Sequence, residues 1–151
     1  MHDLVICALL FAALGSEEKN DPTATLQRAG VKIQRDEKGH VTQLEFRNCR
    51  NTDAVLVDMK EYAHLKVLDL YNSRVTDSGL VRLRLLPQLE TLSVENTPIT
   101  DAGIPRLHEF VNLRTLTLGD TRITDATLEK IKGLENLEVL HLYRTGITDA
   151  G

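Results

Sequence analysis

Residues 113–136 read LRTLTLGDTRITDATLEKIKGLEN, and residues 137–149, LEVLHLYRTGITD, repeat the beginning of that stretch. Matching leucine, threonine and aspartate residues in the two segments lie 24 positions apart. Self-similarity at a fixed period of about 20–50 residues is the signature of a repeat architecture. The same spacing extends back to about Val41, and we therefore expect residues 41–151 to form a stack of about 4.5 equivalent units. Two of the columns are Leu44, Leu68, Leu92, Leu116 and Leu140, and Thr52, Thr76, Thr100, Thr124 and Thr148.

Each repeat predicts a strand, a turn and a short helix. In residues 113–118 apolar and polar side chains alternate, which indicates a half-buried strand. In residues 128–134 the apolar side chains recur at helical spacing and share one face. Thr124 and Asp125 stand just before that helix, where either side chain can accept hydrogen bonds from the free N–H groups of the first turn.

One such unit cannot bury its apolar face alone, so successive units must stack. Stacking places the strands in a parallel sheet on the concave side and the helices on the convex side. The connections between parallel strands are right-handed. The sequence therefore predicts the α/β class and a right-handed solenoid, with a concave sheet and short convex helices.

The repeat resembles that of the leucine-rich-repeat family, whose pattern LxxLxLxxNxL matches residues 137–147 as LEVLHLYRTGI. The resemblance covers roughly residues 41–151. The 24-residue period and the recurring IT-D-A-G segment are similar to bacterial (planctomycete-like) repeats and to the F-box-associated, cysteine-containing type. The resemblance implies a protein-binding or scaffold module, although no F-box-like segment is present to imply a role in ubiquitin ligation. The asparagine position of the pattern is held by Cys49, Ser73, Thr97, Thr121 and Thr145.

Two positions depart from the repeat. Asn51 stands where later repeats have valine or isoleucine, which predicts a degenerate first repeat. Pro105 falls early in the convex segment of the third repeat, and proline disfavours a helix interior. We therefore expect that convex segment to be short or irregular.

Residues 1–15 have the pattern of a secretory signal peptide. The eleven apolar residues 4–14, LVICALLFAAL, are too few to span a bilayer, which takes about 20 residues. They suit the apolar core of a signal that is cleaved after small residues such as Ala13 and Gly15. No lysine or arginine precedes them, so a non-cleaved anchor or a helix packed on the repeats is the alternative. The hypothesis is an exported protein (secreted, periplasmic or in the cell envelope), or a cytoplasmic one if the signal is not real.

Residues 16–40 are predicted to form an N-terminal cap. Asp21-Pro22 favours the start of a short helix, and Gly30 favours its end. Val31 and Ile33 alternate with polar residues as a strand does. Such a segment would cover the first edge of the sheet, and a linker is the alternative interpretation.

The other end of the sequence predicts an open sheet edge. The residues end at Asp149-Ala-Gly, where the next helix would begin, and no polar capping repeat follows. Terminal caps are normally needed for solubility. The strand within residues 137–142 would then invite pairing with another chain. Either the chain is a fragment of a longer repeat protein, or this edge is a contact that allows self-association.

The composition favours binding over catalysis. A formal net charge of -4 offers no basic stripe for nucleic acid. Hydrophobic residues make up 42% and aromatic residues only 4%, which predicts an aliphatic core. No phosphate-loop, GxSxG, HExxH or CxxC motif occurs, so no catalytic, cofactor-binding or metal site is expected, and an enzyme is the least favoured class. Cys49 is expected to be a buried thiol, as free cysteines usually are.

One outward column combines an acid, a hydroxyl and a histidine. In this column Ser93 and His141 belong to strands that are two apart, which separates them by about 10 Å. A nucleophile and its base need about 3 Å between them. The column is therefore not expected to be catalytic. Its members are Glu45, Asp69, Ser93, Thr117 and His141.

The outward side chains of the strands line the concave face, which is the usual binding surface of solenoids. Tyr71 and Tyr143 are the best anchors, because tyrosine is enriched at binding hot spots. The expected partner is another protein, with no nucleic acid and no membrane span in the mature chain. The alternatives are a solvated face without a partner and a structural envelope element that associates through its C-terminal edge. The predicted contact residues are Arg47, Asp69, Tyr71, Ser93, Glu95, Thr117, His141 and Tyr143.

Overall fold

A computed structural model describes residues 23–50, 52–104 and 109–151 of the chain. The predicted signal segment, residues 1–15, lies outside the described residues, as does the first part of the predicted cap. Asn51 and Pro105, the two irregular positions of the repeat, also lie outside them. Within the described residues no helix is long and apolar enough to cross a membrane.

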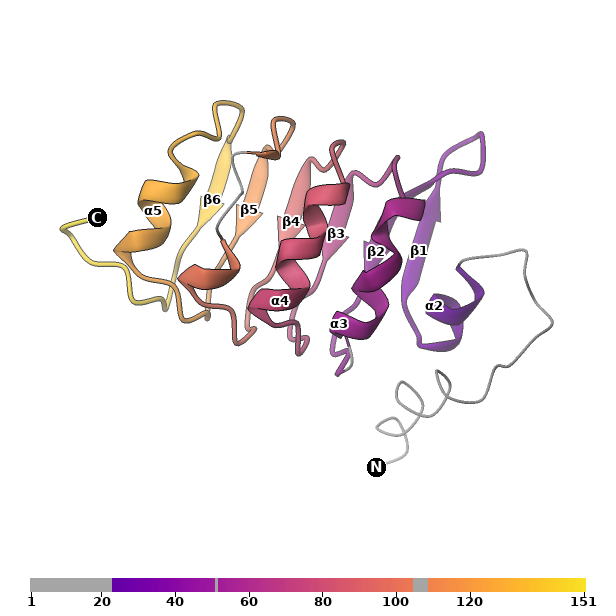
Figure 1. Ribbon diagram of the computed structural model, residues 1–151, viewed down its shortest axis with the longest axis horizontal. Coiled ribbons are helices and arrows are strands. Elements are labelled where there is room, and N and C mark those ends of the chain that lie inside the picture. The colour runs from indigo at the N-terminus through magenta and orange to yellow at the C-terminus, as the bar shows by residue number, and fades with distance from the viewer. Residues whose placement is uncertain (1–22, 51, 105–108) are drawn as a thin grey trace.

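The strands form one six-stranded sheet in the order of the sequence (Figure 1). The last five strands are parallel, and each pairs with the next in a register of 24 residues, as Leu68 does with Leu92 and Leu92 with Leu116. The repeat period of the sequence is therefore the register of the sheet, which confirms the predicted fold. The strands are β1 (Lys32–Arg35), β2 (Val41–Glu45), β3 (Val67–Asp69), β4 (Thr91–Ser93), β5 (Thr115–Thr117) and β6 (Val139–His141).

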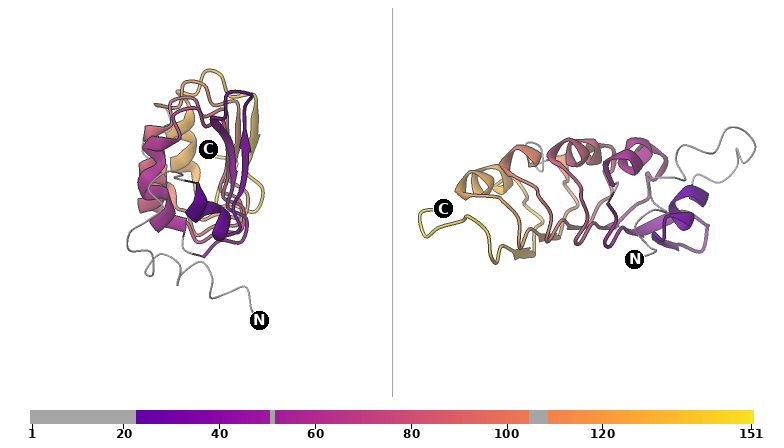
Figure 2. Two further views of the ribbon diagram at one scale, coloured as in Figure 1. Left: turned by 90° about the vertical axis from the view of Figure 1, so that its right-hand side faces the viewer. Right: turned by 90° about the horizontal axis from the view of Figure 1, so that it is seen from below.

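Short helices cover the other side of the stack. Figure 2 shows an arc with the strands along its inner side and the helices along its outer side. The third repeat has only one turn of 3-10 helix, Asp101–Gly103, before residues 105–108, which are not described. The other convex elements are α3 (Thr52–Val55) with the 3-10 helix Leu56–Glu61, α4 (Asp77–Leu80) with the 3-10 helix Val81–Leu85, and α5 (Asp125–Ile131).

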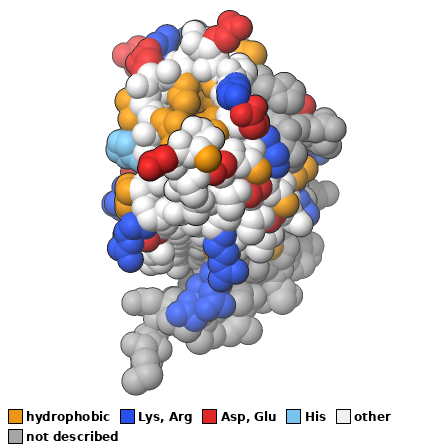
Figure 3. All heavy atoms as spheres, turned by 90° about the vertical axis from the view of Figure 1, so that its left-hand side faces the viewer, with side chains coloured by type: hydrophobic (Ala, Val, Ile, Leu, Met, Phe, Trp, Pro, Cys, Tyr) orange, Lys and Arg blue, Asp and Glu red, His pale blue; other side chains and the backbone are white. Residues whose placement is uncertain are grey.

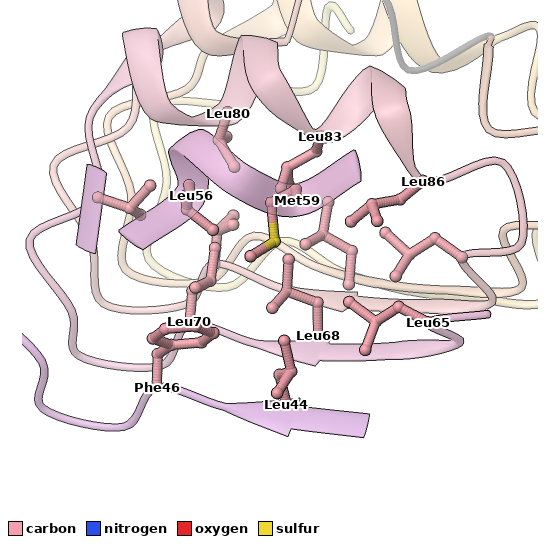
Figure 4. Packing of buried hydrophobic residues seen from close by; sticks show 14 of the residues in the cluster. Leu44, Phe46, Leu56, Met59, Leu65, Leu68, Leu70, Leu80, Leu83 and Leu86 are labelled. Carbon is pink, nitrogen blue, oxygen red and sulfur yellow. The ribbon is translucent and has the colours of Figure 1, made fainter. Parts of the chain in front are cut away.

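The core is aliphatic and lies between the two layers (Figure 4). The inward leucines of the strands meet Met59 and Leu83 from the helical side. Tyr62 is buried too. Burying a leucine side chain stabilises a fold by about 1.5–3 kcal/mol, so these columns supply most of the driving force for stacking. The strand leucines Leu44, Leu68, Leu92 and Leu116 are all at most 1% exposed.

A helix and an antiparallel strand precede the first repeat. The helix α2 (Ala24–Arg28) is followed by Gly30, whose φ of 77° ends it in the left-handed region that glycine tolerates. Strand β1 then pairs antiparallel with β2, with Ile33 opposite Leu44. The outer edge of β2 is therefore hydrogen-bonded rather than open.

Small side chains, most of them with a hydroxyl group, occupy the asparagine position of the repeat pattern in the turns that follow the strands. Thr121 is buried, and its hydroxyl donates to the carbonyl oxygen of Leu118 at 2.6 Å. Thr97 makes the same bond to Val94, three residues earlier. Cys49 occupies the equivalent position in the first repeat as a buried free thiol, as predicted. The column satisfies carbonyl groups that would otherwise be buried without a partner.

The recurring threonine and aspartate divide their roles in a way that the sequence did not predict. The hydroxyl of Thr124 accepts a hydrogen bond from the backbone N–H of Ala126 and so caps α5, as expected. The carboxylate of Asp101 instead accepts from the backbone N–H and the hydroxyl of Thr124 in the next repeat, at 2.9 and 2.8 Å. Of the two residues that the sequence offered as the cap, threonine is the one that caps, because the aspartate side chain reaches two donors in the neighbouring repeat. This Thr–Asp ladder joins Asp53 to Thr76, Asp77 to Thr100, Asp101 to Thr124 and Asp125 to Thr148.

The last repeat differs from the inner ones in the exposure of its apolar residues. Leu116 and Leu118 of the preceding repeat are fully buried, whereas Leu140 and Leu142 are only partly buried. Figure 3 shows apolar side chains gathered at this end of the solenoid. The partly buried set there is Leu137, Leu140, Leu142 and Ile147.

Candidate partner-binding face

The parallel register arranges the outward side chains of the sheet in rows that run along the solenoid. One row lies within the strands and includes Ser93, Thr117 and His141, which are direct neighbours in β4, β5 and β6. A second row lies two residues beyond the last residue of each strand from β2 to β6, where the chain leaves the sheet. We call this second row the rim row; it consists of Arg47, Tyr71, Glu95, Gly119 and Tyr143.

A left-handed residue follows each member of the rim row. Asn72 and Asn96 have φ values of 52° and 54°, which asparagine tolerates better than most residues. The Asn96 amide donates to the Asn72 side-chain oxygen at 2.8 Å. In the last two repeats the column continues as Asp120 and Arg144, which form an ion pair at 3.0 Å. These contacts hold successive turns in one orientation and so align the rim row.

The N-terminal part of the face is a compact charged cluster. The Arg47 Nε donates to the Asp69 carboxylate at 2.8 Å, and its guanidinium carbon lies 5.8 Å from the centre of the Tyr71 ring. The hydrogen bond to Asp69 raises the pKa of Arg47 above its ordinary value. The other oxygen of Asp69 accepts the backbone N–H of Tyr71 at 2.9 Å. Glu45 adds a second carboxylate 3.8 Å from Arg47.

Asp69, one of the predicted contact residues, lies beneath its neighbours. The residue is only 8% exposed, and both of its carboxylate oxygens are engaged, by Arg47 and by Tyr71. Asp69 therefore positions these two side chains, and its contact with a partner stays a prediction.

The C-terminal part of the face is built around Tyr143, which is 46% exposed. Its ring lies across Gly119: a Cβ atom on that glycine would stand 2.6 Å from the ring carbon Cε1. Hydrogen bonding to Glu95 raises the pKa of the Tyr143 hydroxyl to about 12. The hydroxyl of Tyr143 thus contacts the carboxylate of Glu95, which lies two repeats earlier, across the repeat that contains Gly119.

Between these clusters lie Ser93, Thr117 and His141. Ser93 and His141 flank β5 on opposite sides, so a whole strand separates them, which confirms the argument against a catalytic pair. The Thr117 hydroxyl oxygen is covered and has no hydrogen-bond partner among the described residues. It is therefore a weaker candidate for contact than the sequence suggested, whereas His141 is exposed.

The structure brings four of the eight predicted contact residues into the rim row and places the other four in the strands beside it. The residue that sequence reasoning missed is Gly119, which lacks a side chain and so makes room for Tyr143. The sequence did contain a signal for this residue, because Gly119 is the one glycine in a column of large side chains. The rim-row members are Arg47, Tyr71, Glu95 and Tyr143, and the strand members are Asp69, Ser93, Thr117 and His141.

A hollow of about 600 Å³ opens on the turns that lead into α3 and α4. The carboxylate of Asp53 in this hollow already accepts hydrogen bonds from the backbone N–H and the hydroxyl of Thr76. Across the described ranges no three histidine, cysteine or acidic side chains come together as a metal-binding group. The hollow is lined by Arg50, Thr52, Asp53, Arg74, Thr76 and Pro98.

A parallel sheet in 24-residue register, with short helices on its outer side, defines a leucine-rich-repeat solenoid. A family model described as a leucine-rich repeat matches residues 63–83. No curated protein sequence matches the chain. The chain therefore has the leucine-rich-repeat fold, and one of its repeats matches the model of that family.

Solved structures with this fold come from several kinds of protein. An internalin (InlF) from Listeria monocytogenes is 26% identical with a TM-score of 0.53, over 60% of this chain and 26% of that one. The BIR3–SERK2 complex from Arabidopsis thaliana is 16% identical with a TM-score of 0.58, over 85% and 71%. The actin-binding site 2 of leiomodin-1 is 21% identical with a TM-score of 0.54, over 68% and 70%. The chain thus spans about a quarter of the length of the internalin.

Proposed function

We propose that this chain binds another protein through its concave face, with the rim row at the centre of the contact. The observation that carries the proposal is the composition of that row. Two tyrosines, an arginine and a glutamate stand there, outside the aliphatic core. Tyrosine and arginine are among the residues most enriched at binding hot spots.

The rim row is also held in place before any partner arrives. Tyr71 is fixed by the contact of its backbone with Asp69 and by the guanidinium of Arg47. The ring of Tyr143 is held by its packing against Gly119, and its hydroxyl is held by hydrogen bonding to Glu95. Side chains that are already ordered lose less conformational entropy on binding, typically about 0.5–1.5 kcal/mol less for each. The face is therefore prepared for a contact, although the aromatic rings remain accessible.

The size of the face limits the partner. Six strands spaced by about 4.8 Å make a sheet about 24 Å across. A standard interface buries about 800 Å² on each partner. The whole concave face would be needed for such a contact, so a short segment or a single loop of a partner suits it best.

Two known proteins with this fold give general support. One is the complex of two proteins, BIR3 with SERK2, and the other is an actin-binding site, that of leiomodin-1. The proposal gives this chain a non-catalytic role as a binding or scaffold module. It also keeps export through the segment 1–15 and the bacterial or F-box-associated repeat type as hypotheses.

A selection from a displayed peptide library tests the proposal. Binders to the full chain are re-tested on the double variant Tyr71→Ala/Tyr143→Ala and on the control Val111→Ala, which removes an exposed apolar side chain outside the rim row. Circular dichroism verifies that both variants fold. We expect at least tenfold weaker binding to the double variant and unchanged binding to the control. Binders that do not distinguish the double variant from the wild type would contradict the proposal.

A second candidate function is association through β6. The partly exposed apolar residues around this strand favour it, because a further strand and its leucines would complete their burial (Figure 3). The partner would be a second copy of the chain. Light scattering over a concentration series decides: a constant monomer mass excludes this candidate, and a mass that rises with concentration supports it.

A further inference from the structure

We infer that Tyr71, Glu95 and Tyr143 form a receptor for a cationic side chain, an arginine or a lysine, of the bound partner. This inference rests on the proposed function and names the chemistry of its central contact.

The three residues come from different repeats of the rim row, and the Tyr143 hydroxyl contacts the Glu95 carboxylate. Tyr71 and Glu95 occupy equivalent positions in neighbouring repeats, which are joined beside them by the bond from the Asn72 backbone N–H to the Glu95 carbonyl oxygen at 3.0 Å. Tyr143 belongs to a repeat two further along, and its hydroxyl reaches Glu95 only because Gly119 leaves the space between them empty. Glu95 therefore has an aromatic side chain on each side along the row.

Glu95 differs from the other carboxylates of the face because no described lysine or arginine forms an ion pair with it. Glu45 pairs with Lys32 at 3.7 Å and with Arg47 at 3.8 Å. Asp69 pairs with Arg47, and Asp120 pairs with Arg144. Among the described residues Glu95 has no ion pair.

The carboxylate of Glu95 can accept further hydrogen bonds from a ligand. The Tyr143 hydroxyl uses one of about four lone-pair positions that a carboxylate offers. Glu95 is half-buried, so a charge pair formed there is less screened by water than one on an open surface. An arginine guanidinium can donate two parallel hydrogen bonds to a carboxylate, and a lysine ammonium can donate one.

The chain already contains one example of the same recognition. In the neighbouring cluster the guanidinium of Arg47 meets a carboxylate, that of Asp69, and a tyrosine ring, that of Tyr71. A cation within about 6 Å of a tyrosine ring centre is attracted by the negative face of the ring. Glu95 and Tyr143 offer the same two partners, a carboxylate and an accessible ring, without a cation of their own.

The charges nearby do not oppose this assignment. Arg47 and Arg144 are the basic residues next to the two tyrosines, and each is paired with an aspartate. The Tyr143 hydroxyl, with its pKa raised to about 12, stays protonated at neutral pH and continues to donate to Glu95. The unpaired charge at the centre of the row is therefore negative.

A direct test uses a capped tripeptide, acetyl-Gly-Arg-Gly-amide, and the same peptide with neutral citrulline in place of arginine. Both are titrated into the full chain while backbone amide shifts are followed by NMR. We expect the arginine peptide to shift the amides of residues 71, 95 and 143, and the citrulline peptide to bind at least tenfold more weakly. Binding of the arginine peptide should be lost in Glu95→Gln, which keeps the shape of the side chain and removes its charge. It should persist in the control Glu135→Gln, which neutralises an exposed glutamate in the turn before β6.

Equal shifts by the two peptides, or unchanged binding to Glu95→Gln, would overturn the inference. The library binders separate this failure from a failure of the proposed function. Binders that need Tyr71 and Tyr143, carry no basic residue and ignore Glu95→Gln would show a concave interface without the cation receptor. An arginine peptide that binds at Glu95, with no library binder dependent on the rim row, would show the receptor but refute the protein interface.

Discussion

Two columns of this solenoid have the same 24-residue spacing and opposite characters. The Thr–Asp ladder on the turns into the helices repeats the same two residues and the same pair of hydrogen bonds from one repeat to the next. The rim row at the concave side has a different residue in almost every repeat. Its order of arginine, tyrosine, glutamate, glycine and tyrosine makes contacts that occur only once.

The difference separates what the stack needs from what it can vary. A bond between neighbouring repeats must be made each time a repeat is added, so its residues recur. A side chain on the concave rim is not required for stacking, so it is free to differ. Regular columns in a repeat protein therefore identify structural contacts, and irregular columns on an exposed face identify candidates for recognition.

The largest expected effect comes from the core that both columns share. Leu92→Ala removes a side chain that is 1% exposed, and we expect it to lower the free energy of unfolding by about 2–5 kcal/mol. Urea denaturation followed by circular dichroism measures the loss. Val111→Ala, at a residue that is 63% exposed, is the control and should change stability by less than about 0.5 kcal/mol. Similar losses in the two variants would show that the columns do not depend on the aliphatic core.

The second-largest effect is expected when one contact of the Thr–Asp ladder is removed. Asp101→Ala removes the acceptor for the backbone N–H and hydroxyl of Thr124 and for the hydroxyl of Thr127. Because the carboxylate is partly exposed, we expect a loss of about 1–2 kcal/mol in urea denaturation. Asp149→Ala is the matched control, because Asp149 belongs to the same column and makes no side-chain hydrogen bond to another described residue. Equal effects of the two substitutions would refute the ladder as a stabilising contact.

The ladder should also make stability depend on pH. Burial raises the pKa of Asp101, but hydrogen bonds from Thr127 and Thr124 outweigh it and leave that pKa below its ordinary value. Hydrogen bonds from Thr148 lower the pKa of Asp125. Stabilisation by these carboxylates is therefore present above the ordinary aspartate pKa of 3.8 and is lost as the pH falls through the lowered values.

Urea midpoints measured from neutral to acidic pH will test this. We expect the midpoint to fall on acidification, and to fall less steeply in Asp101→Ala. A midpoint that changes with pH to the same extent in the variant would mean that this carboxylate is not linked to folding.

In the rim row the expected effect is a shifted titration. The pKa of the Tyr143 hydroxyl is raised to about 12, first by hydrogen bonding to Glu95. Its contribution to stability is present below the ordinary tyrosine pKa of 10.0 and is lost as the pH rises towards 12. The titration of Tyr143, taken as the difference in phenolate absorbance between the wild type and Tyr143→Phe, should be late and should move to lower pH in Glu95→Gln. The control Glu135→Gln should leave that titration unchanged, and a late titration that survives Glu95→Gln would show that Glu95 is not its cause.

The smallest effect on stability should come from Gly119→Ala. Its added Cβ would stand 2.6 Å from the Tyr143 ring and displace it from Glu95, whereas the backbone at this glycine has no positive φ. We expect a change in stability of less than about 0.5 kcal/mol and several-fold weaker binding of the arginine peptide. In the background of Tyr143→Ala the same substitution should have no further effect on binding. A further loss there would show that Gly119 acts by another route.

Much of the fold could be predicted because it is local and periodic. Alternation within residues 113–118 predicted a strand, and the 24-residue spacing of Leu68, Leu92 and Leu116 predicted their parallel register. The burial of Cys49 and the capping by Thr124 followed from residue type and position. These features depend on neighbours in the chain or on the equivalent residue in the next repeat.

The candidate site was predicted only as a set of outward positions. Asp69 was expected to face outward on the concave side. It is buried beneath Arg47 and Tyr71, because the guanidinium of Arg47 donates a hydrogen bond to its carboxylate. The direction of the Asp101 side chain, towards the next repeat rather than its own helix, also depends on the geometry of two turns at once.

The sequence by itself determined the solenoid, its register, its aliphatic core and the row of outward positions along the concave side, because periodicity encodes each of these. Only the tertiary structure decided which of those residues support others and which remain accessible. The reach of Tyr143 across Gly119 to Glu95 is the clearest case. It depends on the missing side chain of Gly119 in one repeat and on the length of the Tyr143 side chain in the next repeat. The spacing of residues along the chain does not indicate how far a side chain extends.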